Sequence, residues 1–272
     1  MAVILRLYNR VADCVVNVDL ISRLWKSNDY YIIVVSNGCS EGFCFPNDVK
    51  FDGEIVKLQE NLGHFKGNSQ LLTEGAKHIP DECEYAVLLE SDTWLMDDGL
   101  INKYIGKLDG EEKKVWASAN WIDKYHSLAT DFAIVKTSFI KENPGVFGFD
   151  GGAKPEISVY NYISDNGFGF YEIDELYPVH LPKIIPFGPQ VYGKRRKAFP
   201  RGPMVTHHLE NIGNSIERKK ALANMTCGKK VFDTEGRKSK IQLRHYRAYL
   251  ILFQRLLRLA PKSRWFKGRK KG

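Results

Sequence analysis

The sequence has 272 residues, of which 43% are hydrophobic, and a formal net charge of +8. This composition suits a globular protein with one large domain, or a domain plus an appendage. No apolar stretch approaches the ~20 residues that a membrane-spanning helix needs, and the amino terminus lacks the pattern of a signal peptide. The basic residues are concentrated in the last third, which predicts an anionic partner: nucleic acid, membrane lipid or a phosphorylated ligand.

The cysteines are odd in number, scattered, and contain no C-x-x-C pair. They are Cys14, Cys39, Cys44, Cys83 and Cys227. This arrangement favours neither a zinc site nor a disulfide framework. We therefore expect a protein of a reducing compartment, the cytoplasm.

The first hundred residues alternate between buried strands and amphipathic helices. The predicted elements are strands at 3–5, 30–35, 54–58 and 85–90, helices at 14–26 and 69–78, and a Gly-rich loop at 61–68. The order strand, helix, strand, strand, loop, helix, strand predicts an α/β fold with a mainly parallel sheet flanked by helices.

The pattern is looser after this point. The predicted elements are strands at 115–119 and 131–135, a helix from Pro155 to about Asn166-Gly167, a loop from 178 to 203, and an amphipathic helix from 241 to 259. Proline suits the first turn of a helix, and Asn-Gly is a common end signal.

Two carboxylates, Glu90 and Asp92, stand at the end of the buried strand that begins at Tyr85. Ligands of open α/β sheets bind outside the carboxyl ends of the strands. Residues at i and i+2 of an extended chain point the same way, so these two carboxylates would share a face and hold Mg²⁺ or Mn²⁺. The alternative is a strand that stops at a polar turn.

Polar motifs follow the predicted strands in a fixed order. They are Leu7-Tyr8-Asn9-Arg10, the stretch from Val34 to Gly42, the stretch from Asn61 to Asn68, and the stretch from Leu88 to Thr93. In this succession the chain resembles the amino-terminal half of GT-A glycosyltransferases, in particular the inverting family 2 with its rhamnosyltransferase-like members. Those enzymes read roughly "PTYNR", "VVDNGSTDG", "NxGFAxGNN" and "LLNPDT". The resemblance covers about the first hundred residues and implies a Rossmann-like GT-A fold.

The resemblance implies a nucleotide-sugar donor carrying UDP, GDP or dTDP. The implied donor-binding residues are Leu7, Tyr8, Asn9, Arg10, Ser36, Asn37, Asn61, Gly63, Gly67, Asn68, Glu90, Ser91, Arg195 and Arg196. The two glycines allow close backbone approach to phosphate or sugar, and a helix start adds a favourable dipole; a plain helix-entry turn is the alternative. Ser36 stands where the family usually has an acidic residue at the base, so the base stays open.

The resemblance also implies a divalent metal, Mn²⁺ or Mg²⁺, that acts as a Lewis acid on the leaving diphosphate. Asp92 matches the metal ligand, and Glu90 reaches the metal directly or through water. His207 is the candidate third ligand, with His208 as its alternative, because adjacent residues of an extended chain face opposite ways. A structural or solvated histidine pair is the other interpretation.

An inverting transferase needs a carboxylate to remove the proton of the acceptor hydroxyl. In the family this acid starts a helix after a Gly-rich loop, which matches Glu156 behind the stretch from Val146 to Gly152. Glu156 is the candidate base, Asp150 the second candidate and Asp131 the third. Alternatively, Glu156 only favours the helix amino terminus through the dipole.

The resemblance divides the chain into a catalytic domain at 1–215 and a basic amphipathic helical tail at 216–272. Residues 1–100 would bind the nucleotide sugar, and residues 101–215 the acceptor. The tail predicts peripheral attachment to an anionic membrane, at its cytoplasmic face. Its apolar face would otherwise pack on the catalytic domain or on a second subunit.

The predicted function is an inverting, metal-dependent hexosyltransferase that acts on a glycan or lipid-linked acceptor in surface polysaccharide synthesis. A retaining GT-A transferase is one alternative. A basic nucleic-acid-binding protein is another, although the sequence lacks a helix-turn-helix, zinc-finger or RNP pattern, so we expect no nucleic-acid partner. A nucleotidyltransferase normally has a Gly-rich, Lys/Arg-containing loop after the first strand, where this chain has Tyr8-Asn9-Arg10-Val11.

Overall fold

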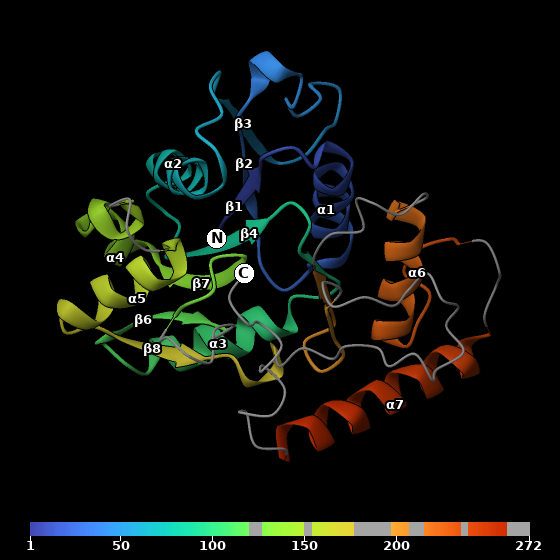
Figure 1. Ribbon diagram of the computed structural model, residues 1–272. Helices are drawn as coiled ribbons and strands as arrows, with labels where there is room; N and C mark the ends of the chain where they lie inside the picture. The colour runs from blue at the N-terminus through green and yellow to red at the C-terminus, as the bar shows by residue number, and fades with distance from the viewer. Residues whose placement is uncertain (120–126, 150–153, 177–196, 207–214, 235–238, 260–272) are drawn as a thin grey trace, which may run out of the picture. The chain divides into compact units, whose positions relative to one another are not determined.

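The computed structural model of the protein describes residues 1–119, 127–149, 154–176, 197–206, 215–234 and 239–259 (Figure 1). The chain divides into two compact units. The first unit is Met1–Asp92 with Asp97–Ile173, and the second is Thr93–Met96 with Asp174–Gly272. The boundary that the sequence suggested at residue 215 falls inside the second unit, and the functional division of the chain stays a prediction.

The strands are β1 (Ala2–Leu7), β2 (Tyr31–Ser36), β3 (Gly53–Lys57), β4 (Tyr85–Glu90), β5 (Trp94–Leu95), β6 (Lys114–Ser118), β7 (Phe132–Lys136), β8 (Gly169–Glu172), β9 (Lys197–Phe199) and β10 (Met204–Thr206). The helices are α1 (Val11–Leu24), α2 (His64–Lys77), α3 (Gly99–Asp109), α4 (Thr137–Glu142), α5 (Pro155–Asp165), α6 (Ser215–Cys227) and α7 (Lys240–Leu259). Short 3-10 helices are η1 (Cys39–Glu41), η2 (Pro144–Phe147) and η3 (Asp174–Leu176).

The first unit is built on a seven-stranded sheet in the order β3-β2-β1-β4-β7-β6-β8. Its strand pairs are parallel except for the two that involve β7, which runs against β4 and β6. The prediction of an α/β fold with a mainly parallel sheet is therefore confirmed. The strand order turns back between β1 and β4, and such a switch point is where open α/β sheets bind ligands.

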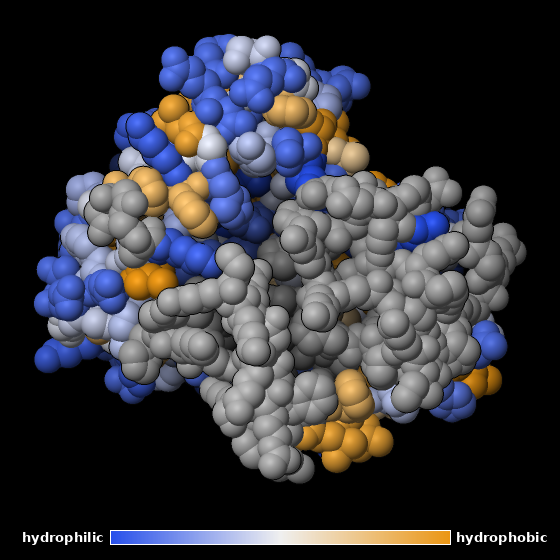
Figure 2. Space-filling view, viewed as in Figure 1, coloured by the Kyte–Doolittle hydropathy of each residue, from blue (hydrophilic) through white to orange (hydrophobic). Residues whose placement is uncertain are grey.

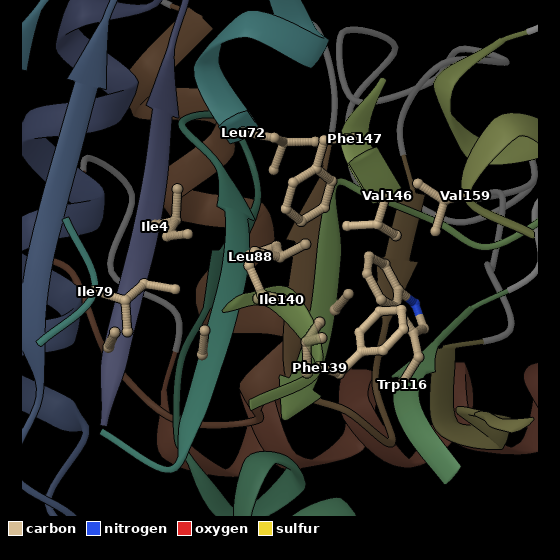
Figure 3. Close-up of a cluster of buried hydrophobic side chains, with 14 of the residues drawn as sticks. Ile4, Leu72, Ile79, Leu88, Trp116, Phe139, Ile140, Val146, Phe147 and Val159 are labelled. Atoms are coloured by element: carbon tan, nitrogen blue, oxygen red, sulfur yellow. The ribbon is translucent and has the colours of Figure 1, made fainter. Parts of the chain in front are cut away.

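Helices cover both faces of this sheet. Strand residues alternate between the faces, and Ile4 and Leu88 belong to a buried cluster that also contains Leu72 of α2, Ile140 of α4 and Val159 of α5 (Figure 3). Helix α1 lies on the other side of β1 and β2 from α2 (Figure 1). Helix α3 contacts β6 and β7 through residues that are not part of the cluster. The helices cover the faces of the sheet, and polar residues gather at its carboxyl edge.

Close packing fixes α2 against the sheet. A Cβ atom at Gly75 would lie 2.5 Å from Cγ2 of Ile4 and 3.1 Å from Cγ2 of Val35, distances that real Cβ atoms do not tolerate without movement. Glycine at this position therefore allows the helix to approach β1 and β2. The result places the first turn of α2 directly beside the carboxyl end of β1.

The sequence predicted some of these elements with wrong limits and omitted others. Helix α2 begins at His64, five residues before its predicted start, so Gly67 lies inside the helix. Gly63, with φ of 80°, ends the loop instead. Helices α3, α4 and α6 and the strands β5, β8, β9 and β10 were not predicted, and β9 lies within the predicted loop at 178–203.

In the second unit, β5, β10 and β9 form an antiparallel sheet. Helix α6 contacts β10, β9 and α7. The α7 prediction is confirmed within one residue, and this helix buries Leu243 and Leu250. Within the described ranges, no helix is long and apolar enough to cross a membrane.

Candidate active site

Strands β1 and β4 run side by side in register, with Arg6 opposite Glu90. The amide of Asn17, on α1, donates from Nδ2 to the carbonyl oxygens of Glu90 at 3.2 Å and Ser91 at 3.3 Å. The amide N–H of Ser91 in turn donates to the carbonyl oxygen of Arg6 at 3.0 Å. These bonds fix the backbone at the point where β4 ends and the acidic motif begins.

A buried arginine is the centre of this edge. The Arg6 side chain is 2% exposed, and its guanidinium donates to Oδ1 of Asn68 and to the carbonyl oxygen of Thr130. Its Nη2 lies 3.6 Å from Oε1 of Glu90. Arg6 is not among the residues that the sequence motifs indicate. The available signal was a charged residue inside an otherwise apolar strand, because arginine is almost never fully buried unless it is paired.

Carboxylates from three further segments act on this guanidinium. Glu90, Asp131, Glu156 and Asp92 each raise the pKa of Arg6, while burial lowers it by more, so that the net direction is downward. Four carboxylates against one guanidinium leave an excess of negative charge. We call these five residues the Arg6 cluster.

The excess of negative charge affects the pKa of Glu90. Burial raises its pKa to about 8, Arg6 opposes that rise, and the negative charges of Asp92, Asp131 and Glu156 add to it. The Glu90 side chain retains 31% exposure. A bound cation would reverse this direction, because an adjacent positive charge favours the ionised carboxylate.

Glu156 lies in the first turn of α5, as the sequence predicted. Its carbonyl oxygen accepts a hydrogen bond from the amide of Leu128 at 3.0 Å, which ties α5 to the segment before β7. Its carboxylate Oε2 is buried and has no hydrogen-bond partner within the described part of the chain. The second base candidate, Asp150, lies outside the described residues, and so do Arg195, Arg196, His207 and His208.

Asp131 precedes β7 and reaches the same edge because β7 is antiparallel. Its carbonyl oxygen accepts a hydrogen bond from the amide of Glu90 at 2.9 Å, and its Oδ1 accepts one from the amide of Phe132 at 3.1 Å. The structure therefore brings the third base candidate close to the first one, within the electrostatic reach of the same arginine.

A second polar group lies at the end of β2. Asn37 is fully buried, and neither its Nδ2 nor its Oδ1 has a hydrogen-bond partner in the described residues. A Cβ atom at Gly67 would lie 2.9 Å from Asn37 Nδ2 and 3.6 Å from Asn61 Oδ1. Asn61 Oδ1 accepts a hydrogen bond from the amide of Gly63 at 2.9 Å. A buried amide without partners is costly, so this position is suited to a polar ligand.

The other predicted donor residues differ in their accessibility. Tyr8 and Asn9 are exposed, whereas Leu7 is fully buried and offers a ligand no side-chain surface. Arg10 forms an ion pair with Asp13, with 3.7 Å between Nη1 and Oδ2. Ser36 is also fully buried, and its Oγ accepts a hydrogen bond from the amide of Phe45 at 3.3 Å.

A disulfide joins Cys39 and Cys44, whose Cα atoms are 4.7 Å apart. The expectation that the chain forms no disulfide is therefore wrong. The reason is local: Gly38 and Gly42 have φ of 72° and 84° and fold the segment back on itself, which brings together two cysteines that are only five positions apart. The disulfide closes the loop that ends at Phe45, next to Ser36.

The residues of this edge suit a divalent cation in charge and in donor type, because carboxylate oxygens are the ligands that Mg²⁺ and Mn²⁺ prefer. Within the ranges that the structure describes, however, no three His, Cys, Asp or Glu side chains are grouped so as to hold a metal. Asp92 and Glu90 would supply two ligands, and the remaining ones would come from elsewhere, such as a phosphate.

No protein-family model and no curated protein matches the chain. It is similar in structure to mouse xyloside xylosyltransferase 1, at 10% identity and a TM-score of 0.42 over 67% of this chain and 87% of that one. It is also similar to 4-diphosphocytidyl-2C-methyl-D-erythritol synthase from Anaerococcus prevotii, at 15% identity and a TM-score of 0.44 over 63% of this chain and 85% of that one.

A third similar structure is glucosyl-3-phosphoglycerate synthase from Mycobacterium tuberculosis, solved with Mn²⁺, UDP-glucose and glycerol 3-phosphate. The identity is 11% and the TM-score 0.41, over 63% of this chain and 69% of that one. Likenesses at these values are too distant to assign an activity to this chain. The α/β architecture and the Arg6 cluster are the findings on which a function can be based.

Proposed function

We propose that the protein is a GT-A-type glycosyltransferase that moves a sugar from a nucleotide-sugar donor to an acceptor hydroxyl with inversion. The observation that carries the proposal is the Arg6 cluster at the switch point of the sheet, where a buried guanidinium lies 3.6 Å from the carboxylate of Glu90 and within the electrostatic influence of Asp92, Asp131 and Glu156. The strand-end motifs supply the donor class, since they resemble those of inverting family 2.

The donor would occupy the carboxyl edge of β1, β2 and β4. Exposed Tyr8 and Asn9 are available to the nucleoside, and the amide of Asn37, which has no hydrogen-bond partner among the described residues, can donate to and accept from a sugar or base. Gly67 leaves the space in front of that amide open. These contacts would hold the donor before chemistry begins.

Glu156 is the proposed general base. Its Oε2 has no partner in the described residues and is free to take the proton of an acceptor hydroxyl. The acceptor oxygen then forms a bond to C1 of the donor sugar, while the bond from C1 to the diphosphate oxygen breaks and nucleoside diphosphate leaves. Attack from the face opposite the leaving group inverts the anomeric centre. Asp131 is the alternative base.

Charge supports a metal requirement. A diphosphate is anionic, and the Arg6 cluster already has an excess of carboxylates, so donor and site repel each other without a cation. Asp92 and Glu90 would hold Mn²⁺ or Mg²⁺. When bound, the ion neutralises the diphosphate as it departs. Arg6 meanwhile pairs with the carboxylate of Glu90 and holds Asn68 and the carbonyl of Thr130.

The test is thermal unfolding with UDP-, GDP- and dTDP-sugars, with and without Mn²⁺ or Mg²⁺. A ligand at about 100 times its Kd stabilises a protein by about 2.7 kcal/mol. We expect one nucleotide class to raise the unfolding midpoint only with metal, and Asp92→Asn to abolish the rise. The matched control is Asp48→Asn, because Asp48 is exposed on a loop. A full rise in Asp92→Asn would overturn the metal assignment.

Glu156→Gln tests the base. We expect transfer to fall by about 10²- to 10⁴-fold while the donor-induced rise of the unfolding midpoint is kept, because the amide preserves shape but takes no proton. Glu142→Gln, at the exposed end of α4, is the control. Analysis of the product anomer separates the inverting reaction from the retaining alternative. Release of pyrophosphate from a nucleoside triphosphate would instead identify a nucleotidyltransferase.

Acceptor and compartment belong to the same proposal. A glycan or lipid-linked acceptor, used in surface polysaccharide synthesis at the cytoplasmic face of a membrane, is what the resemblance implies. Disulfides are rare in reducing compartments, so the redox state of Cys39 and Cys44 in freshly isolated protein is the measurement that tests the expected compartment.

A further inference from the structure

Helix α7 has two apolar faces. One face buries Leu243 and Leu250 in the second unit. The other carries large apolar side chains that remain open to solvent: Ile241 at 65%, Tyr249 at 45%, Leu252 at 55% and Leu256 at 54% exposure.

The exposed side chains form one stripe. At about 100° per residue, Ile241, Leu252, Leu256 and Tyr249 fall within roughly a quarter of the helix circumference. Hydrophobic atoms are visible at the lower margin of the space-filling view, where Figure 1 shows α7 (Figure 2). An exposed stripe of this kind on a long helix signals an interaction surface.

A cationic pocket borders the stripe. It encloses about 420 Å³ between the end of α6 and α7, and its lining includes Lys229, Arg244, Arg247, Ala248 and Ile251. None of the described residues that line it is acidic. Arg247 is held by the carbonyl oxygens of Pro200 at 3.3 Å and Cys227 at 3.2 Å.

Two of these cations are available to a ligand. No hydrogen bond or ion pair engages Lys229 or Arg244 among the residues for which the structure gives positions, and both side chains are exposed. The whole of α7 contains basic residues and no Asp or Glu. Apolar side chains and unneutralised cations therefore lie together on one surface.

We propose that this surface of α7 docks on an anionic phospholipid membrane. The stripe enters the boundary between headgroups and acyl chains, and the pocket holds the phosphate of one lipid headgroup between Lys229, Arg244 and Arg247. This combination is what an interfacial helix requires. Nucleic acid fits the pocket but leaves Ile241, Leu252 and Leu256 without a role, since aliphatic side chains do not stack on bases. The inference goes beyond the proposed transfer reaction and does not depend on it.

The test is sedimentation of the full chain with vesicles of phosphatidylcholine alone, and with vesicles that contain roughly one third phosphatidylglycerol, a fraction that gives a negative surface potential. We expect binding to the anionic vesicles only. Each cation near such a surface contributes about five-fold in affinity, so Lys229→Ala/Arg244→Ala should weaken binding about 25-fold. Leu252→Gln/Leu256→Gln should weaken it by more than about ten-fold, through lost apolar burial.

Control variants make the result specific. Lys50→Ala/Lys113→Ala removes two exposed cations from the first unit and should leave binding unchanged. Thermal unfolding of each variant, with unchanged midpoints, shows that the fold is intact. Free inorganic phosphate at high concentration should not displace the vesicles, because the stripe holds them as well as the pocket.

Several results would overturn the proposal. Equal binding by the Leu252/Leu256 variant would show that only charge is involved. Absence of binding to anionic vesicles would show that α7 does not dock on a membrane. Concentration-dependent dimers that this variant disperses would assign the stripe to a second copy of the chain. If the Leu252/Leu256 variant still binds generic DNA in a salt-sensitive way, the basic residues of this surface bind nucleic acid instead of lipid.

Discussion

The two ends of the central sheet differ in how their buried carboxylates are balanced by hydrogen-bond donors and positive charge. Near the start of β2, the buried carboxylate of Asp98 accepts hydrogen bonds from the amide of Ser27 at 2.7 Å, from Ser27 Oγ at 2.9 Å and from the hydroxyl of Tyr30 at 3.0 Å. At the carboxyl end, Arg6 pairs with Glu90, and Asp92, Asp131 and Glu156 add further negative charge around it. A carboxylate whose hydrogen bonds are all made stabilises the fold. A cluster with excess negative charge is instead typical of a site where a bound ligand or cation balances that charge.

The largest effect should follow from removing the shared cation. Arg6→Met leaves the four carboxylates without a guanidinium, and breaking a buried charge arrangement by deleting one partner costs about 3–5 kcal/mol. We expect that loss in urea unfolding at pH 9 and a smaller loss at pH 6, where protonation of Glu90, whose pKa is raised to about 8, relieves the repulsion. An equal loss at both pH values would mean that packing, not charge, explains the effect.

The Asp98 network should show the contrasting behaviour. Asp98→Ala leaves the Ser27 amide and the Tyr30 hydroxyl without their acceptor, at a cost of about 2–3 kcal/mol. Transfer measured well below the unfolding midpoint should stay within about two-fold of the unmodified protein, a difference under 0.5 kcal/mol. A much larger loss of transfer would place this end of the sheet in the functional machinery and remove the contrast.

Glu90 should make the stability of the carboxyl end of the sheet depend on pH. Its pKa in the folded protein is raised from 4.5 to about 8, so the folded protein holds this proton more tightly than the unfolded chain. Its contribution to stability is therefore present below pH 4.5 and is lost as the pH rises towards 8.

Glu90→Gln should remove that pH dependence. We expect the variant to gain about 1–2 kcal/mol over the unmodified protein at pH 8 and nothing at pH 4.5. This figure is discounted from the full shift at 1.36 kcal/mol per pH unit, because the side chain is 31% exposed. Denaturant unfolding across this pH range is the measurement, and parallel stability curves would contradict the assignment.

Two glycines provide the finest comparison. Gly67→Ala places a Cβ 2.9 Å from Asn37 Nδ2, so donor affinity should fall about ten-fold, or 1.4 kcal/mol. Gly63→Ala meets no atom within 4 Å, but its φ is 80°, so we expect about 1 kcal/mol of lost stability and unchanged affinity. Ligand titration and thermal unfolding of both variants test this separation.

The sequence predicted the parts of the fold that local patterns encode. Apolar runs located β1, β2 and β4, and the proline before Glu156 marked the start of α5. Helix α3 was missed, although Leu100, Ile101, Tyr104 and Leu108 bury one face of it. Its two glycines obscured the pattern, since glycine is a poor helix former.

The site was predictable only where its residues stand in motifs. Asp92 and Glu156 were found through their positions at a strand end and a helix start. Arg6 was not, because its role depends on Asn68 and Thr130, which are distant in sequence. The Cys39–Cys44 disulfide also escaped, since backbone turns at Gly38 and Gly42, rather than cysteine spacing, bring the sulfur atoms together.

The hydrogen bond from Arg6 to Thr130 closes a loop of 124 residues, and the one from Arg6 to Asn68 spans 62. Contacts between residues so far apart form late in folding, because loop-closure entropy must be overcome before they contribute. A refolding chain can therefore form its helices before these contacts exist. During refolding, ligand binding therefore returns only when the contacts of Arg6 form. Partly folded chains that lack these contacts do not act on any donor.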